Sequence, residues 1–480
     1  MAGFYSLEIG KRALLAQRFG IDVTSNNIGN VNTPGYSRRT AILTETPPGK
    51  SQNQYVGTGA KVSLLRNFRS ELLDKEVRTA TSQVKSMQLE QDLYQKIDAV
   101  LAEPSENGLN ELTNKFLSTF NNLALIPDDI AQRQFLLEQA HTLAERFNST
   151  AIGLSEIRND TKFSLNQQIQ NANKLIQEIV ELNKSIVNSK AQTNSEAQTL
   201  VDKRANKLEE LSNLFGINVS YNDDGTANVF VNGSNIITSQ VGSILRLNET
   251  VNEITGEKTL EIIKINPENQ STTIISPQSG EIATNLKFYN IVLDDKESTN
   301  SFSIAKQLDE FANALVQSIN SKTITGFGIN DKGPQPPGRT FFEPNIGFVS
   351  ASLIKVSKDI EDKPEDIPLS SKPSEPGNND IARAIGRILE DRSFLDGQNP
   401  SEFYANFLGK VSYATSEAIN GLNTSKLIQS QLETQRESLI GVNLDEEAIS
   451  LIKFQKAFEA ASRVINTANE MLNTIVNLGR

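Results

Sequence analysis

The residue types that most enzymes use for catalysis are scarce in this chain. Its 480 residues include no cysteine and a single histidine, His141. Without cysteine there is no disulfide framework, thiolate-bound zinc, iron–sulfur cluster or thiol nucleophile. One imidazole cannot form a histidine-based metal cluster, and it leaves little room for a Ser-His-Asp arrangement. We expect His141, which falls within a predicted helix, to be structural or exposed.

Short patterns that resemble ligand-binding loops are incomplete. Residues 49–51 read Gly-Lys-Ser, but a phosphate-binding loop needs a glycine five positions earlier, where Thr44 stands. Residues 222–225 lack the spaced ligands and closing glutamate of a calcium loop and predict a hairpin turn. The sequence does not exclude a pair of carboxylates at the separation that glycosidases use, because a chain with 58 acidic residues offers many pairs. The sequence predicts no catalytic residue, no metal, no cofactor and no enzyme activity.

The overall charge argues against nucleic acid as a partner, since 47 basic residues face 58 acidic ones, for a net charge of −11. A mild basic excess near the N-terminus is more typical of a solvated helix face than of nucleic-acid or lipid contact. Its bases are Lys11, Arg12, Arg18, Arg38 and Arg39. No apolar run exceeds four residues, so we expect neither a membrane span nor a cleaved signal peptide. The chain should stay in the cytosol or leave it by a route without a cleaved signal.

The N-terminus predicts a helix with one apolar face. Over residues 4–23, apolar and small residues recur at steps of three and four, a set called here the N-terminal seam: Ile9, Ala13, Ala16, Gly20 and Val23. Beside it, seven residues apart, run Leu7, Leu14 and Ile21. A stripe with this period stays on one helix face and favours a partner helix. Its small residues should let that partner approach closely.

The clearest pattern in the chain lies at the C-terminus, over residues 444–478. Steps of three and four alternate without a break in a set called here the C-terminal seam: Leu451, Phe454, Phe458, Ala461, Ile465, Ala468, Leu472 and Ile475. Asn443 stands at the N-cap position, and Glu446 follows at the capping-box spacing. Such a helix would be roughly 50 Å long. One narrow stripe on so long a helix needs other helices, from this chain or from its neighbours.

Between the ends, the period changes from helix to strand and back. We expect helices at 61–100 and 108–214, broken at Pro104 and Pro127. The second region carries a further stripe of steps of three and four: Leu165, Ile169, Ala172, Ile176, Ile179, Asn183 and Ile186. Strands are expected at 217–221, 228–231, 235–238, 244–247, 260–265, 273–275 and 286–293. Helices return at 302–321, 380–391 and 400–437, after a Pro- and Gly-rich stretch expected to be an exposed loop with one or two strands.

These patterns predict a mainly α protein with an inserted β-rich domain, in which long coiled-coil-like helices from both termini lie side by side. We assign residues 1–60 and 438–480 to a terminal-helix domain. Residues 61–215, 300–325 and 380–437 form a helical domain, 216–299 the β-rich insert, and 326–379 the extended loop.

Both ends of the chain also resemble a known family. The Asn-rich segment Ser25–Arg38, of which residues 25–37 are expected to be a loop, resembles the N-terminal signature of the rod, hook and hook-associated proteins of the bacterial flagellar axis. The residues that carry this likeness are Asn26, Asn27, Asn30, Asn32, Thr33, Pro34, Gly35 and Tyr36. At the other end, Gly441–Glu447, Leu451–Gln455 and Thr467–Leu472 resemble the FlgK family of flagellar hook-associated proteins.

The resemblance implies a structural protein that forms the first junction layer between hook and filament. Both termini would then form an inner tube, with the helical domain around it and the β-rich insert facing outward. The implied partners are further copies of the chain, the hook protein on one side, a second hook-associated junction protein on the other, and a cytoplasmic export chaperone on the C-terminal helix. The family is exported by the flagellar type III apparatus without a cleaved signal and lies outside the cell. Neither nucleic acid nor membrane is implied.

We expect the assembly interface to use the apolar stripes of the two terminal helices. Its expected residues are Leu7, Leu14, Ile21, Leu451, Phe454, Phe458, Ile465, Leu472 and Ile475. The alternative is that these residues only close a coiled coil within the chain. A related hypothesis holds that the terminal helices are poorly ordered in the monomer and fold on docking. Two other functions stay open: a hook or distal rod protein, and a secreted adhesin or surface enzyme whose active part is the β-rich insert.

Overall fold

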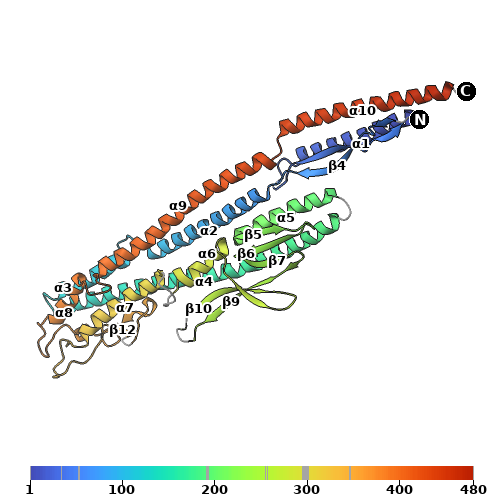
Figure 1. The fold of residues 1–480 in the computed structure, drawn as a ribbon. Helices are drawn as coiled ribbons and strands as arrows, with labels where there is room; N and C mark the ends of the chain where they lie inside the picture. The colour runs from blue at the N-terminus through green and yellow to red at the C-terminus, as the bar shows by residue number, and fades with distance from the viewer. Residues whose placement is uncertain are drawn as a thin grey trace.

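The chain is a long rod of helices with both termini at one end (Figure 1). The computed structural model describes residues 2–33, 35–51, 54–190, 194–253, 256, 258–294, 302–344 and 347–478. It confirms a mainly α fold with an inserted β-rich region and long terminal helices packed together. Within the described residues, no helix has both the length and the apolar character needed to cross a bilayer.

The body of the rod contains two pairs of long helices. α2 (Glu71–Leu101) lies along α9 (Pro400–Ile440), and α4 (Ile130–Lys190) lies along α5 (Asn194–Leu214). The end of the rod far from the termini is built with α3 (Leu109–Leu123), α7 (Ile304–Thr323) and α8 (Asp380–Gly386) (Figure 1). The expected breaks at Pro104 and Pro127 both fall between helices.

Polar side chains fix where several helices begin. Ser70 accepts a hydrogen bond from the amide of Leu73 in the first turn of α2. Asn399 and Glu402 form a reciprocal capping box at the start of α9. Asn443 caps α10 (Leu444–Leu478), as its position in the sequence predicts. These caps satisfy amides that the helices themselves leave unpaired.

The β-rich insert contains two antiparallel sheets that lie against α4. One has the order β5 (Ile217–Tyr221), β6 (Ala227–Val231), β7 (Ser234–Thr238) and β8 (Val241–Gly242). The other has the order β11 (Thr272–Ile275), β10 (Lys258–Ile265) and β9 (Ile244–Val251). Asn232 and Gly233 both have positive φ, as a two-residue hairpin turn requires. Six of the seven expected strands are confirmed.

A buried polar side chain joins this insert to the α4–α5 pair. Asn183 occupies one position of the apolar stripe of α4 and is fully buried. Its amide nitrogen donates to the carbonyls of Ala227 and Ser239, and its oxygen accepts from the Ala227 amide and from Arg204 at 2.8 Å. Burial lowers the pKa of Arg204 to about 10. Asn183 therefore replaces an apolar contact with hydrogen bonds that hold the sheet backbone in one place.

Two hydrophobic cores share α4. One lies between α4, α5 and the sheets, where Leu165, Ile176 and Val229 are buried. The other lies at the far end of the rod and is rich in aromatic rings, which include Phe116, Phe120, Phe147, Phe311, Phe341 and Phe342. Several of these rings pack edge to face, with centroids 5.0 to 5.3 Å apart.

The expected helix over 61–100 is wrong in its first residues. β4 (Ala60–Asn67) is a strand and pairs antiparallel with β1 (Arg39–Glu45). The short strands β2 (Gly49–Ser51) and β3 (Gln54–Val56) form a second pair between them. A strand is stabilised by its partner, and this partner lies about twenty residues away in a region without a clear period.

The strand expected at 286–293 is also wrong. The chain forms α6 (Glu281–Lys287) and continues as one π-helical turn, Phe288–Val292. The β-prone residues of this segment are buried on a helical face, since Phe288 and Val292 enter the aromatic core and Tyr289 enters the other. Burial between two cores outweighs the local preference for a strand.

The expected exposure of the Pro- and Gly-rich stretch 326–379 is confirmed for residues such as 332–335 and 374–377 but is wrong for its apolar anchors, and its irregular path is confirmed. It contains the short strands β12 (Phe342–Glu343) and β13 (Lys355–Val356) and one-turn 3₁₀ helices at Ala351–Leu353 and Pro364–Asp366; a further 3₁₀ turn, Arg387–Glu390, follows α8. Many of its apolar side chains are buried in the aromatic core, and they include Phe341, Val349, Ile354, Ile360, Ile367 and Leu369, whereas Phe348 and Leu353 are exposed. Spaced apolar anchors thus hold an irregular backbone against the helices.

Arg133 of α4 also fixes this stretch. It is 2% exposed, and its guanidinium donates to the carbonyls of Pro127, Pro364 and Ile367 at 2.7 to 3.1 Å. Burial lowers the pKa of Arg133 to about 10. The side chain therefore satisfies the carbonyls of a segment that has little regular secondary structure of its own.

Arg133→Met should free these carbonyls and lower the free energy of unfolding by about 2–4 kcal/mol. Hydrogen exchange should show faster backbone exchange at residues 360–370. Arg392→Met is the matched control, because Arg392 is 79% exposed, and it should change stability by less than about 0.5 kcal/mol. Equal effects of the two substitutions would contradict this role for Arg133.

Candidate assembly site

The two terminal helices lie antiparallel and in close contact (Figure 1). α1 (Ala2–Gly29) approaches α10 so closely at two glycines that a Cβ atom has no room. A Cβ at Gly10 would lie 2.7 Å from Cγ1 of Ile465, and one at Gly20 would lie 2.7 Å from the ring of Phe454. The small residues of the N-terminal seam thus permit the close approach that the sequence predicts.

The residues expected to form the assembly interface lie around this contact. Half-buried along the helix pair are Leu7, Leu14, Ile21, Leu451, Phe454, Phe458, Ile465 and Leu472. Ile475 differs, because it is 61% exposed. The structure therefore places most of the C-terminal seam against α1 of the same chain. Contact of these residues with neighbouring copies stays a prediction.

A cluster of polar residues, called here the clasp, closes the base of the helix pair. Asn27 is 1% exposed and makes four hydrogen bonds. Its amide nitrogen donates to Glu447 Oε2 at 3.0 Å and to the Arg39 carbonyl, and its oxygen accepts from the Arg39 amide and the Tyr36 hydroxyl. Arg38 pairs with Glu447 at 2.7 Å. Only an amide side chain can both donate and accept in this way.

A second cluster ties the segment after the clasp to the rod. Asp202 of α5 is 6% exposed and accepts from Ser37 at 2.6 Å, from Arg39 at 2.8 Å and from Arg69 at 3.3 Å. Arg69 also pairs with the buried Asp74. Burial alone would lower the pKa of Arg69, but the two carboxylates raise it above its ordinary value. These ion pairs fix the terminal helices relative to α5 and α2.

The Asn-rich motif residues divide between a helix and a turn. Asn26 and Asn27 were expected in a loop, but α1 continues to Gly29, because the side chains of this last turn find partners in the clasp. Asn30 accepts from Thr33 at 3.1 Å, while Asn32 and Gly35 are exposed in the turn. Pro34 lies outside the described residues.

Tyr36 connects the turn of the motif to the end of α1. Its hydroxyl donates to the side-chain oxygens of Asn26 and Asn27, and the Arg39 guanidinium lies 5.1 Å from its ring centroid. Burial raises the pKa of Tyr36 even though Arg39 acts in the opposite direction. The hydroxyl therefore stays protonated near neutral pH and remains a donor.

Sequence reasoning missed the partners of the motif. Arg38 and Arg39 were noted in the basic excess and Glu446 as a capping residue, and Arg38 and Glu446 also lie in the family segments, but none of the three was assigned an ion-pair partner. In the structure Glu446 pairs with Arg38 at 2.7 Å instead of closing a capping box. Asp202 carried no signal, since an acidic residue within the polar helix 194–214 is ordinary.

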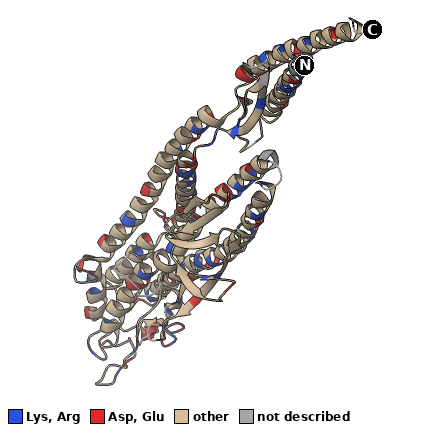
Figure 2. Ribbon diagram, turned by 45° about the vertical axis from the view of Figure 1, so that its right-hand side comes forward, with Lys and Arg blue, Asp and Glu red and all other residues tan. Residues whose placement is uncertain are grey.

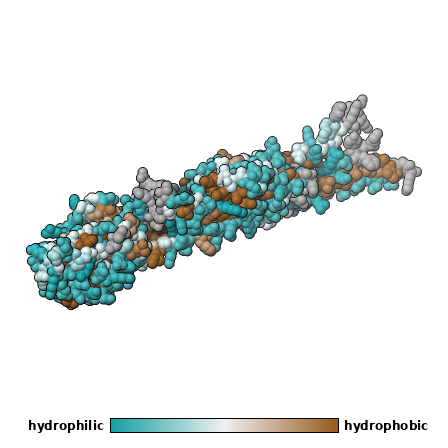
Figure 3. All heavy atoms as spheres, turned by 90° about the horizontal axis from the view of Figure 1, so that it is seen from below, coloured by the Kyte–Doolittle hydropathy of each residue, from teal (hydrophilic) through white to brown (hydrophobic). Residues whose placement is uncertain are grey.

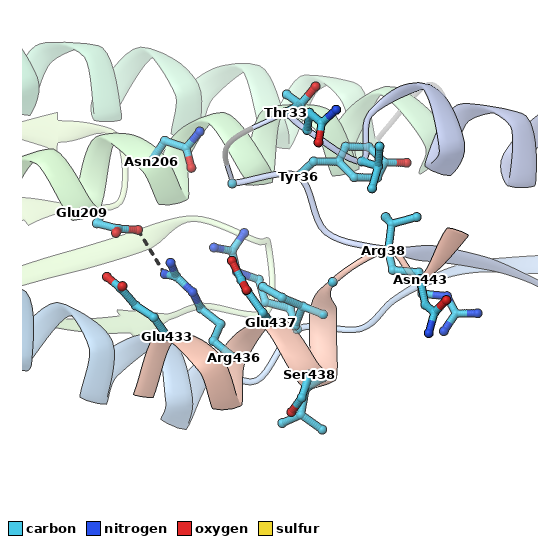
Figure 4. A pocket seen from close by; sticks show the side chains of 18 of the residues that line it. Thr33, Tyr36, Arg38, Asn206, Glu209, Glu433, Arg436, Glu437, Ser438 and Asn443 are labelled. Atoms are coloured by element: carbon cyan, nitrogen blue, oxygen red, sulfur yellow. Dashed lines mark hydrogen bonds and ion pairs between the residues drawn. The ribbon is translucent and has the colours of Figure 1, made fainter. Parts of the chain in front are cut away.

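A cleft of about 1200 Å³ opens beside these clusters. Its walls are the end of α9, the facing side of α5 and the motif turn, and Arg436 reaches across it to Glu209 at 3.1 Å (Figure 4). Elsewhere, acidic and basic residues are interspersed along the rod (Figure 2). Within the described residues, no cluster of His, Cys, Asp and Glu could hold a metal ion.

Comparisons with known proteins agree with this geometry. Residues 94–342 match the model of the flagellar hook-associated protein FlgK helical domain. Residues 7–36 match that of the flagella basal body rod protein, and residues 438–478 that of the flagellar basal body rod FlgEFG protein C-terminal region.

Relatives align over nearly the full length. The chain is 24% identical to flagellar hook-associated protein 1 of Bacillus subtilis (strain 168), over 99% of this chain and 98% of the relative. It is 21% identical to the protein of that name from Escherichia coli (strain K12), over 97% and 98%. The structure of the flagellar hook junction protein FlgK from Burkholderia pseudomallei aligns with a TM-score of 0.48 at 20% identity, over 56% of this chain and 46% of that one.

Terminal helices joined at one end of a rod, with rod-protein matches on both of them, define a flagellar axial protein. Within that class, the helical-domain model covers just over half of the chain. The chain belongs to the FlgK family of flagellar hook-associated proteins. A structural role in the flagellum follows from this membership.

Asn27→Asp should open the clasp, because the new carboxylate would face Glu447 without the donor that now bridges them. We expect a loss of about 2–4 kcal/mol in the free energy of local opening, measured by hydrogen exchange at residues 24–30 and 444–450. Asn26→Asp is the matched control, since exposed Asn26 needs only its oxygen to accept from Tyr36. An Asn27 variant that exchanges like the Asn26 variant would refute the clasp.

Gly20→Ala should separate the terminal helices, because its Cβ would overlap the ring of Phe454. Shifting that ring should cost about 1–3 kcal/mol, seen as faster hydrogen exchange along α1. The control is Gly29→Ala, where no heavy atom lies within 4 Å of the added Cβ. It should leave stability unchanged or raise it by up to about 1 kcal/mol. Similar exchange in both variants would contradict a tight contact at Gly20.

Proposed function

We propose that the chain assembles through its terminal helices as the first junction layer between the flagellar hook and the filament. Family membership and the paired termini support this proposal. The alternatives of hook or distal rod protein are less well supported, because the hook-associated helical domain matches residues 94–342. We further propose that the assembled protein acts as a scaffold and not as an enzyme.

The observation that carries the proposal is an apolar stripe on α10 that lies beside the seam and stays exposed. Val464, Met471 and Ile475 are seven and four residues apart, so they lie on one side of the helix. Their exposed fractions are 48%, 58% and 61%. We call them the outer stripe. Contiguous exposed apolar residues on a soluble protein are typical of an interaction surface.

The terminal helices would therefore have two contact surfaces. The seam residues hold α10 on α1, and the outer stripe is left for neighbouring copies. Ile475 belongs to both sets, and the half-exposed Leu7, Leu14 and Ile21 could extend the contact on α1. Copies arranged in this way would form a ring or tube, with hook protein on one side and a second hook-associated protein on the other.

We assign domains accordingly. Residues 1–60 and 438–480, which contain the terminal helix pair, would form the inner tube. Residues 61–215, 300–325 and 380–437 would form the surrounding helical domain, with the stretch 326–379 packed on it. The β-rich insert 216–299 would face outward. This division agrees with the two cores, which lie outside the terminal pair.

We propose that the chain leaves the cell through the flagellar export apparatus without a cleaved signal and lies at the hook–filament junction. Before export, a cytoplasmic chaperone would cover α10, whose apolar residues on two faces need protection from water. Electron microscopy of a deletion strain tests the assignment, since loss of a junction protein should leave hooks without filaments. Loss of the hook itself would favour the hook-protein alternative.

Met471→Asp should place a charge in the outer stripe without disturbing the seam. We expect normal helix content and export, but at least a tenfold loss of incorporation at the hook tip, because an unpaired charge would be buried in the contact. Incorporation is measured by immunogold labelling and motility by swimming assays. Asn466→Asp, exposed on another face of α10, should behave as wild type. Full motility of the Met471 variant would rule out the outer stripe as an interface.

A further inference from the structure

The cleft between α9, α5 and the motif turn has the character of a protein-binding groove. Its volume of about 1200 Å³ exceeds the roughly 300–1,000 Å³ of most small-molecule pockets. Its lining combines apolar residues with charged ones, and Leu439 in the α9 wall is 54% exposed. Apolar surface that stays exposed in a polar groove favours a second macromolecular surface.

The charge on the α9 wall limits what can bind there. The cleft is lined by five glutamates and three arginines, which are Glu209, Glu210, Glu433, Glu437, Glu446, Arg38, Arg69 and Arg436. Each arginine has a carboxylate partner. Glu433 and Glu437, one turn apart on α9, form no ion pair within the described chain. A helix face with two unpaired like charges gains from a basic partner.

The outer face of α1 carries a surface complementary to the α9 wall of the cleft. Lys11, Leu15 and Arg18 are four and three residues apart, which places them on one face of the helix, away from Gly10 and Gly20 that contact α10. All three are exposed, and Leu15 is 53% exposed. No carboxylate of the described residues forms an ion pair with Lys11 or Arg18. Two bases that flank a leucine are complementary to the two glutamates and Leu439.

The two surfaces cannot meet within one chain. Arg18 lies about 13 Å along α1 from Asn27, which is fixed to the start of α10 by the clasp. The outer face of α1 is also turned away from α9 by the contact with α10. The complement must therefore come from a second copy.

We infer that the cleft receives the outer face of α1 from a neighbouring copy. Lys11 and Arg18 of the neighbour pair with Glu433 and Glu437, and its Leu15 contacts Leu439. This contact rests on the proposed assembly, which brings identical chains side by side, and it gives a function to Lys11 and Arg18, two of the five residues of the N-terminal basic excess. The interface is heterologous, because two different surfaces meet, and such contacts give a ring when the rotation between copies closes and a helical tube when it does not.

Charge reversal tests the pairing. Glu433→Lys with Glu437→Lys should lower incorporation into flagella at least tenfold, since like charges then face each other. Lys11→Glu with Arg18→Glu should do the same. A chain that carries all four substitutions should recover to within about threefold of wild type, because the opposite charges are restored. No recovery in the combined variant, with circular dichroism spectra like wild type, overturns the inference.

Crosslinking gives an independent readout, because the chain contains no cysteine. Arg18→Cys with Glu437→Cys should give disulfide-linked multimers in flagella isolated from cells that express only this variant. Arg18→Cys with Lys174→Cys is the control, because Lys174 lies on α4, is 75% exposed and should not link. Multimers in the first variant alone support the contact, and equal yields or none overturn it.

The location of the unsubstituted chain in the same flagella distinguishes failure of the cleft contact from failure of the proposed function. If unsubstituted chain lies at the hook–filament junction, but the fourfold charge variant does not recover and the Arg18→Cys, Glu437→Cys variant does not crosslink, only the cleft contact is wrong. If unsubstituted chain is absent from the junction, the proposed function is wrong and the cleft contact falls with it.

Discussion

The close antiparallel contact between α1 and α10 is the constraint on which the rest of the structure depends. Glycines on α1 remove the Cβ atoms that would hold the helices apart, so that large side chains of α10 reach its backbone. Contacts between small residues permit sliding, because they offer few distinct knobs. The hydrogen bond between Asn27 and Glu447 prevents sliding, because a shift of one helix along the other would separate the buried Glu447 carboxylate from this donor. The glycines thus supply the closeness, and the clasp supplies the register.

The joint between this helix pair and the rod uses charge where the rod itself uses apolar cores. Arg39 and Arg69 converge on the buried Asp202, and directional hydrogen bonds fix an orientation that apolar contact would leave free. The apolar cores of the rod lie elsewhere, one against the β-rich insert and one at the far end. Because the joint is small and polar, it leaves the facing surfaces of α9 and α5 uncovered. That is the physical origin of the cleft.

Local signals made much of this fold predictable. The Asn443 cap marked the start of α10, and the turns at 222–225 and 232–233 separated β5, β6 and β7. Elements that depend on distant partners were not predictable, such as β4, whose partner β1 lies across a segment without a clear period. The candidate site divides in the same way. Its motif and seams could be read from the sequence, but the contact of Asn27 with Glu447 joins residues 420 positions apart, and Asp202 has no local signal.

An internally closed coiled coil and an assembly surface need not be alternatives, because the outer stripe lies beside the seam and stays exposed when α1 and α10 pair. A helix buries an apolar stripe on the side that its partner covers, and α1 covers only one side of α10. The apolar residues that remain at Val464, Met471 and Ile475 gain nothing from that pairing. No other described helix of the chain lies along α10, because α1 and α10 project beyond the other helices (Figure 1), and apolar atoms are visible along this narrow end of the molecule (Figure 3). On the proposed assembly, the pairing within each chain prepares a rigid surface, so that less conformational entropy is lost when copies dock.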